Sequence, residues 1–402
     1  MVPTKNHISF MVPEREIEKR ILWLTSLLKE KNISLVLLNH PVDICYFTGS
    51  AQDGVLIVPA DEEPIFYVKK SVKRAEHESC IRISPYSGRK ELVKEMRGVI
   101  DDSKSIGISA DTMAASYYLW LRNEFRDCRI VDVGYEIRVK RSVKSPWEIQ
   151  QIRKAALQIE TVFGEMGDHI RPGLREVDSS SSVEKRIREL GHSGTIRVHR
   201  PGSSLGILSL VSGDSALYPT SFDGPVGGEG LYPSSPPGAG WKRIVKDEIV
   251  MVDIVSSFNG YHTDHTRVFY TGKKIPERAY SAHKFCIEVI ERISGCLRPG
   301  RRCSDVFREI GEWIEKREIP DGFMGYGENR VKFFGHGIGL ELDELPVIAP
   351  KFDMVLREGM VVAVEPKAFI KGIGGVGIEE TYIIKKHGGE PVCKFEKDIV
   401  LL

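Results

Sequence analysis

The sequence predicts an α/β (α+β) protein of two domains, and three observations carry this prediction. The chain has 402 residues, more than a single hydrophobic core usually accommodates. Along it, apolar residues alternate between helical spacing and short strand-like runs. A strong helix-start signal near residue 145 separates the two parts, for which we expect domains at 1–140 and 141–402.

The N-terminal part begins with a helix pattern at 14–31, where apolar residues recur at helical spacing and charges fill the other face. Short apolar runs bounded by Asn, Pro, Gly and Asp predict the strands of a small α/β domain at 35–38, 55–58, 65–68, 105–109 and 129–132. A further helical stretch is expected near 115–125. This part carries no motif from which chemistry can be inferred.

The second domain is expected to open with a long helix. Ser145, Pro146 and Glu148 supply an N-cap residue, a first-turn proline and a capping-box acid in order. The preceding stretch, 133–144, is then the natural connector. Further on, 224–240 is so rich in Gly and Pro that it predicts a loop, either a binding loop or a surface excursion. Helices are expected to follow at 276–297 and 305–316.

Charge and composition exclude several classes of function. With 57 basic and 56 acidic side chains the net charge is +1, which offers no surface for nucleic acid or anionic lipid. No apolar run approaches the roughly 20 residues that cross a bilayer. The seven cysteines are scattered, without paired metal-ligand spacing, and the N-terminus lacks an apolar signal core, so we expect buried thiols in a cytoplasmic protein. A small molecule is the expected partner.

Two aspartates lie on a predicted β-hairpin. The segments 248–255 and 260–270 are strand-like, and Asn259-Gly260 is the strongest short hairpin signal. With these two as turn residues, Asp253 faces Thr266 and lies diagonal to Asp264, so both carboxylates project from one face. Close carboxylates raise each other's pKa unless a cation lies between them. The pair indicates either a metal site or an aspartate that faces solvent near a turn.

Three more side chains extend this set. Glu365 follows the apolar run 360–364, and Glu379 lies in the strand-like run 376–384; the two runs could pair as a second hairpin. His336 lies between glycines that let the backbone pack closely and leave the imidazole facing a cavity. Four carboxylates and one imidazole suit Mn(II) or Co(II), with Fe(II) or Zn(II) as alternatives, and two divalent cations would balance the charge.

The order of these five residues, in the contexts VDIVSSFNGYHTDHTR, GHGIGLELDE, VEPKAF and GIEET, resembles the pita-bread metallopeptidases. This family includes methionine aminopeptidase, aminopeptidase P, prolidase and creatinase. YFTGS at 46–50 and VKSPWEIQQIRKAA at 143–156 are similar to the branch of creatinase, prolidase and aminopeptidase P, so the resemblance covers nearly the whole chain. It implies a creatinase-like N-terminal domain, a pita-bread C-terminal domain and a homodimer.

The resemblance also implies the activity of a metal-dependent hydrolase of the Xaa-Pro dipeptidase or aminopeptidase type. In such a site two metal ions are bridged by water or hydroxide, which cleaves a peptide (imide) bond because the metals lower its pKa. The implied metal ligands are Asp253, Asp264, His336, Glu365 and Glu379.

The chain departs from the family pattern at three places. Asp343 stands where these peptidases have a histidine, seven residues after the ligand histidine, that helps to polarise the scissile carbonyl. The stretch 213–221 offers Tyr218, Thr220 and Ser221 in place of another histidine. Gly377 stands where a basic residue is common, two before the final glutamate. Loss of one oxyanion donor costs about 100- to 1000-fold in rate, which weakens the proline-peptidase assignment.

Three residues are candidates for catalytic roles beside the metals. His262 has the same strand parity as Asp264, so we expect it to point toward the metals and carry a proton; a strand-edge histidine bonded to backbone is the alternative. His199 lies in RVHRPGSS, a segment that approaches the active site in this branch. Asp343 occupies the position of the family's histidine, and Asp343→His tests whether that position decides the reaction.

Three functions remain open from the sequence. The first is an Xaa-Pro peptidase with altered groups around the metals. The second is a bimetal enzyme of the same lineage that acts on a carbon–nitrogen or carbon–oxygen bond of another small molecule, with the 224–240 loop shaping the pocket. The third is a non-catalytic metal-binding homologue. Clustered carboxylates without a metal or a task would destabilise the fold, which argues against the third.

Overall fold

The structure is a computed structural model that describes residues 10–199 and 205–402. The chain divides into two compact units, Met1–Arg138 and Val139–Leu402. The division falls inside helix α7 (Gly134–Ser142), so most of the stretch expected as a connector is helical. Within the described ranges, no helix is both long and apolar enough to cross a membrane.

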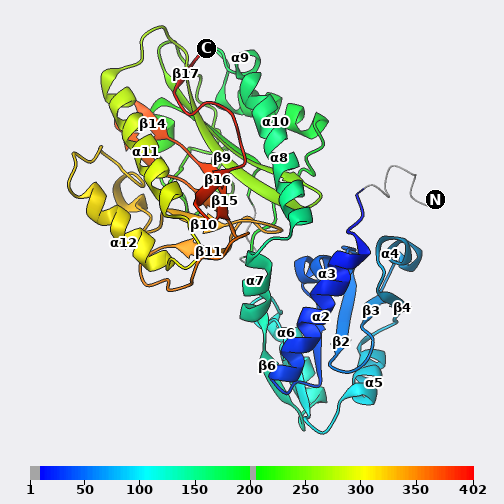
Figure 1. Cartoon of the computed structure of the whole chain (residues 1–402). Coiled ribbons are helices and arrows are strands. Elements are labelled where there is room, and N and C mark those ends of the chain that lie inside the picture. Colours follow the sequence, from blue (N-terminus) through cyan, green and yellow to red (C-terminus); the bar gives the residue numbers. More distant parts are fainter. Residues whose placement is uncertain (1–9, 200–204) are drawn as a thin grey trace. The chain divides into compact units, whose positions relative to one another are not determined.

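The first unit is built on a mixed sheet with the strand order β4-β3-β2-β1-β5-β6 (Figure 1). Its strands are β1 (Leu35–Leu38), β2 (Gly54–Pro59), β3 (Ile65–Val68), β4 (Arg82–Pro85), β5 (Ser105–Ile108) and β6 (Arg129–Asp132). Its helices before α7 are α2 (Glu14–Glu30), α3 (Pro41–Thr48), α4 (Val72–Glu78), α5 (Arg89–Val99) and α6 (Ala115–Glu124). The strands and helices expected in this part of the sequence are confirmed.

In the second unit the end of α7 is followed by the predicted long helix, α8 (Pro146–Gly164). The Ser145 hydroxyl accepts a hydrogen bond from the Glu148 amide at 3.2 Å, and the Glu148 carboxylate accepts one from the Ser145 amide at 2.7 Å. This reciprocal pair satisfies two amides that a helix start otherwise leaves unpaired. The helices α9 (Met166–His169) and α10 (Glu176–Glu189) follow.

A sheet in the order β17-β9-β8-β7 lies against these helices (Figure 1). Its strands are β7 (Leu208–Ser212), β8 (Ile249–Phe258), β9 (Tyr261–Tyr270) and β17 (Val400–Leu401). In β8, Val250 and Val252 pack with apolar residues of α8 and α10, whereas Met251 packs in the cluster that contains α11 (Glu277–Cys296) and α12 (Cys303–Ile314). Asp253 shares the parity of Met251, so its side chain lies on the inner face.

The inner face meets a second sheet in the order β11-β10-β12-β15-β16 and a hairpin of β13 and β14. The strands are β10 (Gly335–Gly337), β11 (Glu344–Ile348), β12 (Val361–Val364), β13 (Lys367–Ile370), β14 (Gly374–Gly377), β15 (Glu380–Lys385) and β16 (Gly388–Pro391). β12 and β15 pair antiparallel, as the sequence suggested. They are not a simple hairpin, because β13 and β14 are inserted between them and Val376 lies in β14.

Short 3₁₀ turns, η1 (Gly213–Leu217) and η2 (Gly327–Asn329), complete the regular structure of the described residues. The 224–240 segment contains only an isolated bridge between Tyr232 and Ser235, which confirms that it is a loop. Backbone hydrogen bonds from Gly228 to Tyr218 and from Gly230 to Gly238 fold it back on itself. Of the unpaired cysteines, only Cys286, Cys296, Cys303 and Cys393 are buried, so the expectation of buried thiols is wrong for the exposed Cys80.

Two contacts join the sheets where the acidic residues gather. Thr266 of β9 and Glu379 exchange backbone hydrogen bonds of 3.2 and 3.3 Å. The Thr381 hydroxyl of β15 accepts from the Asp264 amide and donates to the Asp264 carbonyl, both at 3.0 Å. These contacts fix residues 264–266 of β9 to the start of β15.

A buried histidine of α11 predicts acid sensitivity. His283 donates through Nε2 to the Lys397 carbonyl at 2.7 Å and accepts through Nδ1 from the Gly377 amide at 3.2 Å. Burial lowers its pKa to about 4. The unfolded chain therefore takes up a proton below about pH 6.5 that the folded chain refuses until about pH 4, so stability falls as the pH falls through this window.

When the pH is lowered from 7 to 5, the free energy of unfolding should fall by about 2 kcal/mol less in His283→Gln than in the unmodified chain. Urea unfolding at the two pH values measures this difference. Because the comparison is between slopes, any loss of packing that acts equally at both pH values cancels. Equal pH dependence in the two proteins would show that His283 protonates freely inside the fold.

Candidate metal centre

The five residues predicted as metal ligands line one cavity. Asp253 lies on β8, Asp264 on β9 and His336 on β10, whereas Glu365 follows β12 and Glu379 lies between β14 and β15. In the β8–β9 hairpin Asp253 faces Thr266 and Asp264 faces Val255. The predicted register of the hairpin is confirmed.

Three of these residues fit a single cation. Asp264, His336 and Glu379 each offer one donor atom, and the three atoms lie within 4.8 Å of one another. Among the described residues, Asp264 Oδ1 and Glu379 Oε1 are buried without a hydrogen-bond partner. Burial, with Glu379 beside it, raises the pKa of Asp264 well above its usual range. A divalent cation would satisfy both oxygens, since carboxylate and imidazole together suit Mn(II), Co(II), Fe(II) or Zn(II).

His336 is oriented by its own loop. Its Nδ1 lies 3.0 Å from the Leu342 carbonyl and 3.1 Å from that of Gly337, while Nε2 lies 3.9 Å from Glu379 Oε1. A proton on Nδ1 leaves the Nε2 lone pair for a metal. Burial opposes the charged ring, but Asp343 and Glu365 raise its pKa overall. A Cβ atom on either flanking glycine would lie 2.1 to 2.2 Å from a neighbouring carbonyl, so the close backbone packing expected there is confirmed.

A lysine that we did not anticipate stands among the acids. Lys367 is fully buried on β13, with Nζ 2.5 Å from Glu379, 2.8 Å from Glu365 and 3.4 Å from Asp253. Burial disfavours its charge, but these carboxylates outweigh burial and hold its pKa well above the usual range. A lysine ahead of the buried run Ala368 to Ile370 was the available signal, because lysine is almost never fully buried unless paired.

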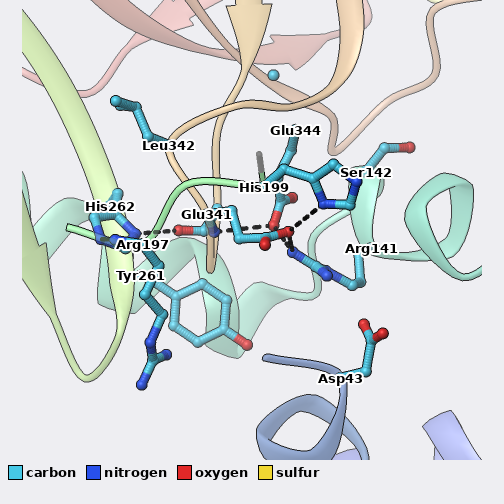
Figure 2. Close-up of polar contacts among 12 residues, drawn as sticks. Asp43, Arg141, Ser142, Arg197, His199, Tyr261, His262, Glu341, Leu342 and Glu344 are labelled. Atoms are coloured by element: carbon cyan, nitrogen blue, oxygen red, sulfur yellow. Dashed lines mark hydrogen bonds and ion pairs between the residues drawn. The ribbon is translucent and has the colours of Figure 1, made fainter. Parts of the chain in front are cut away.

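The loop after His336 is held by buried ion pairs. Arg141 contacts both Glu341 and Glu344 at 2.6 Å, and Lys144 contacts Glu344 at 3.0 Å. Although burial opposes ionisation, Lys144 and Arg141 lower the pKa of Glu344 to about 2. In Figure 2 the side chains of Arg141 and His199 both point at the Glu341 carboxylate. The network fixes the segment whose Leu342 carbonyl orients His336.

Comparison with known proteins places the chain. The sequence model of the family described as "Metallopeptidase family M24" matches residues 150–386, more than half of the chain, and that of the "Creatinase/Prolidase N-terminal domain" matches 20–143. The chain belongs to metallopeptidase family M24. By membership it is a metallopeptidase-type hydrolase, and divalent metal ions are implied. The resemblance recognised in the sequence is confirmed.

Relatives match along their full length. The Xaa-Pro dipeptidase of Pyrococcus furiosus is 24% identical over 96% of this chain and 100% of its own. Among solved structures, the prolidase of Pyrococcus horikoshii OT3 has a TM-score of 0.78 at 24% identity, covering 95% of this chain and 100% of that one. An Xaa-Pro dipeptidase from Bacillus anthracis has a TM-score of 0.78 at 25% identity, covering 96% and 100%. The fold is that of the creatinase and prolidase branch of M24, as expected.

His262 does not line the cavity, and the expectation that it faces the metals is wrong. Its backbone amide and its Nδ1 lie 2.7 and 2.9 Å from the Gly339 carbonyl, and its Nε2 accepts from the Arg197 amide at 3.4 Å. Burial lowers its pKa to about 4. Strand parity puts His262 on the same face as Asp264, but at this point of β9 the loop after His336 passes beside the strand and binds the imidazole. The alternative, a histidine hydrogen-bonded to backbone, is the one that the structure contains.

The other two catalytic candidates differ in position. His199 lies 3.3 Å from Glu341 and is outside the cavity lining; the remainder of its motif, 200–204, lies outside the described residues. Asp343 lines the cavity, with Oδ1 3.8 Å from His336 Nδ1 and its side chain 46% exposed. Of the three candidates only Asp343 is placed to meet a substrate.

The Gly- and Pro-rich loop forms one wall of this M24 site. Phe222, Gly224, Pro225, Val226 and Pro237 line the cavity. Tyr218, Thr220 and Ser221, considered as replacements for a missing histidine, are not in the lining. This part of the lining is therefore mostly apolar, with Asp223 as its charged member.

The Glu344 network predicts a large loss of stability on substitution. Glu344→Gln removes the partner of Lys144 and one partner of Arg141, and breaking a buried ion pair costs about 3–5 kcal/mol. Glu390→Gln, which removes a half-exposed partner of Arg153, is the matched control and should cost less than about 1 kcal/mol. Urea unfolding at pH 7 compares them. Losses of equal size would mean that the buried network contributes no more than a surface pair.

Proposed function

We propose that the chain is a metal-dependent Xaa-Pro peptidase whose divalent cation, Mn(II) or Co(II) first among the alternatives, is bound by Asp264, His336 and Glu379. The observation that carries this proposal is the convergence of three donor atoms within 4.8 Å, two of them buried oxygens without a hydrogen-bond partner in the described part of the chain. Glu365 and Asp253 complete the acidic set. Buried carboxylates left unpaired are destabilising, and a bound cation would offset that cost.

A bound divalent cation lowers the pKa of water and polarises a carbonyl oxygen, which is the chemistry that hydrolysis of an imide bond requires. The chain's own residues prepare the site for it. The Leu342 carbonyl holds the His336 proton on Nδ1, and the Glu341 and Glu344 ion pairs hold the loop that carries Leu342. His262 and His199 serve as positioning residues for this loop, not as groups that touch the substrate.

The shape and chemistry of the cavity support a proline-containing substrate. Phe222, Pro225, Val226 and Pro237 of the lining offer apolar surface suited to a pyrrolidine ring, and Asp223 adds one carboxylate beside them. Similarity to Xaa-Pro dipeptidases along the whole chain agrees with this choice. If the site held the two cations that the resemblance implies, Asp253 and Glu365 would help to hold the second, and both already contact the Lys367 ammonium.

One observation keeps a second candidate function. The half-exposed Asp343 carboxylate lines the cavity, and the family resemblance gives its place in the sequence to a histidine that would help to stabilise a tetrahedral oxyanion. A carboxylate repels such charge, so this position favours an M24 enzyme that acts on another small molecule, in particular one that carries a positive charge.

The direct test is hydrolysis of Ala-Pro, Met-Pro and Gly-Pro, with Ala-Ala as the comparison, by purified protein supplied with Mn(II) or Co(II). We expect cleavage of the proline dipeptides and loss of cleavage in Asp264→Asn. Elemental analysis of the same samples reports the bound metal. Protein that binds metal but leaves every proline dipeptide intact would exclude the peptidase and favour the second candidate.

Asp343→His should raise kcat/KM for Xaa-Pro dipeptides by about 10- to 100-fold, because it returns a hydrogen-bond donor to the oxyanion position. Asp343→Asn is the matched control, since it removes the charge without adding an imidazole. A gain in Asp343→His alone assigns the effect to the imidazole. Equal gains in both variants would instead assign it to loss of the negative charge.

Assembly and location complete the proposal. The resemblance implies a homodimer, and the scattered, unpaired cysteines favour a reducing compartment such as the cytoplasm. Light scattering of purified protein tests the first point, and fractionation of the source cells tests the second.

A further inference from the structure

We propose that the ammonium group of Lys367 takes the place of one metal ion, so that this chain binds one divalent cation where its acidic set would otherwise hold two. The inference rests on the proposed function, because it concerns the number of cations at the same site. It follows from the position of the Lys367 ammonium group among the carboxylates.

The first support is the position of Lys367 Nζ. It lies 2.5 Å from Glu379 Oε2, 2.8 Å from Glu365 Oε2 and 3.4 Å from Asp253 Oδ2. Three carboxylates from three different segments thus point their oxygens at one ammonium. A second metal ion would need these same oxygens, and two cations cannot share them at such distances without repulsion.

The second support is the division of Glu379 between two cation positions. Its Oε2 contacts Lys367, whereas its Oε1 has no hydrogen-bond partner among the described residues and lies 3.9 Å from His336 Nε2. Asp264 Oδ1, the other buried oxygen without a partner, lies on this side. The acidic set therefore has one side satisfied by the lysine and one side arranged for a metal.

The third support is that Lys367 is confined. Its side chain is 0% exposed, so the ammonium has no contact with bulk water. Across the β13–β14 ladder its partner is Gly377, where a Cβ atom would lie 2.5 Å from the Lys367 Cα. The strand opposite thus adds no side chain at this point. If the Lys367 ammonium moved away from its carboxylates, it would be a buried charge without a partner.

Charge balance agrees with one metal ion. In the ionised form that binds a cation, Asp253, Asp264, Glu365 and Glu379 would carry four negative charges, of which Lys367 with one divalent cation offsets three. A second divalent cation would reverse the sign of the site.

The decisive measurement is the number of Mn(II) ions bound per chain at saturation, determined by equilibrium dialysis with elemental analysis, together with the electron paramagnetic resonance spectrum. Metals in two-metal sites lie about 3.5–4 Å apart and couple magnetically, so the spectrum distinguishes an isolated ion from a pair. We expect one isolated Mn(II) in the unmodified chain. Two Mn(II) ions with a coupled spectrum would overturn the proposal.

Lys367→Met removes the ammonium charge and shortens the unbranched side chain by one heavy atom. We expect this variant to bind two Mn(II) ions with a coupled spectrum. Lys242→Met, which removes a partly buried lysine that pairs with Glu248 away from the carboxylate cluster, is the control and should still bind one. One ion in Lys367→Met would show that the lysine does not displace a metal.

Two carboxylate variants make the test independent of how well Lys367→Met folds. Asp253→Asn removes a lysine contact and should leave the count at one, whereas Asp264→Asn removes a metal donor and should bring it to zero. Loss of the ion from both would contradict the division of the site. An unmodified chain that binds no Mn(II) at all would instead overturn the proposed metal dependence itself, an outcome distinct from a count of two.

Discussion

Four clustered carboxylates on the inner face of the C-terminal unit, three of them buried and that of Asp253 partly buried, set the requirement that the surrounding structure meets. Isolated ionised carboxylates are too costly to bury, so positive charge has to be supplied or the groups must take up protons. The structure supplies one charge through Lys367 and leaves the oxygens of Asp264 and Glu379 on the other side facing His336. The same cavity is lined by the metal-ligand candidates, by Asp343 of the loop after β10 and by residues 222–226.

Rigid backbone connections hold the acidic residues together against their repulsion. The bridge between Thr266 and Glu379 and the paired bonds between Thr381 and Asp264 tie the two sheets at the site. A second layer of charge, Arg141 with Glu341 and Glu344, holds the loop that fixes the His336 tautomer. Such supporting contacts decide ligand geometry as much as the ligands themselves.

Local signals in the sequence predicted what local physics decides. The Asn259-Gly260 turn fixed the register of Asp253 against Thr266, and Ser145 with Glu148 fixed the start of α8. What could not be predicted depends on segments that meet only in the fold. Arg141 and Glu341 are 200 residues apart, and the carbonyl that binds His262 comes from the loop after His336. Strand parity gave the direction of His262 but could not reveal which loop passes there.

The exchange of residues across the β13–β14 ladder links the departures from the family pattern. A basic residue was expected two positions before Glu379, and the chain has Gly377 there; directly opposite, on β13, stands Lys367. The positive charge has not been lost from the site but placed on the neighbouring strand, where it contacts the carboxylates themselves. With Asp343 in the cavity instead of a histidine, positive charge is concentrated on the ligand side and reduced on the substrate side. Both changes depart from the two-metal peptidase pattern of the family. A site whose acids are partly neutralised by lysine needs fewer metal ions. A substrate pocket lined by a carboxylate stabilises an oxyanion less well.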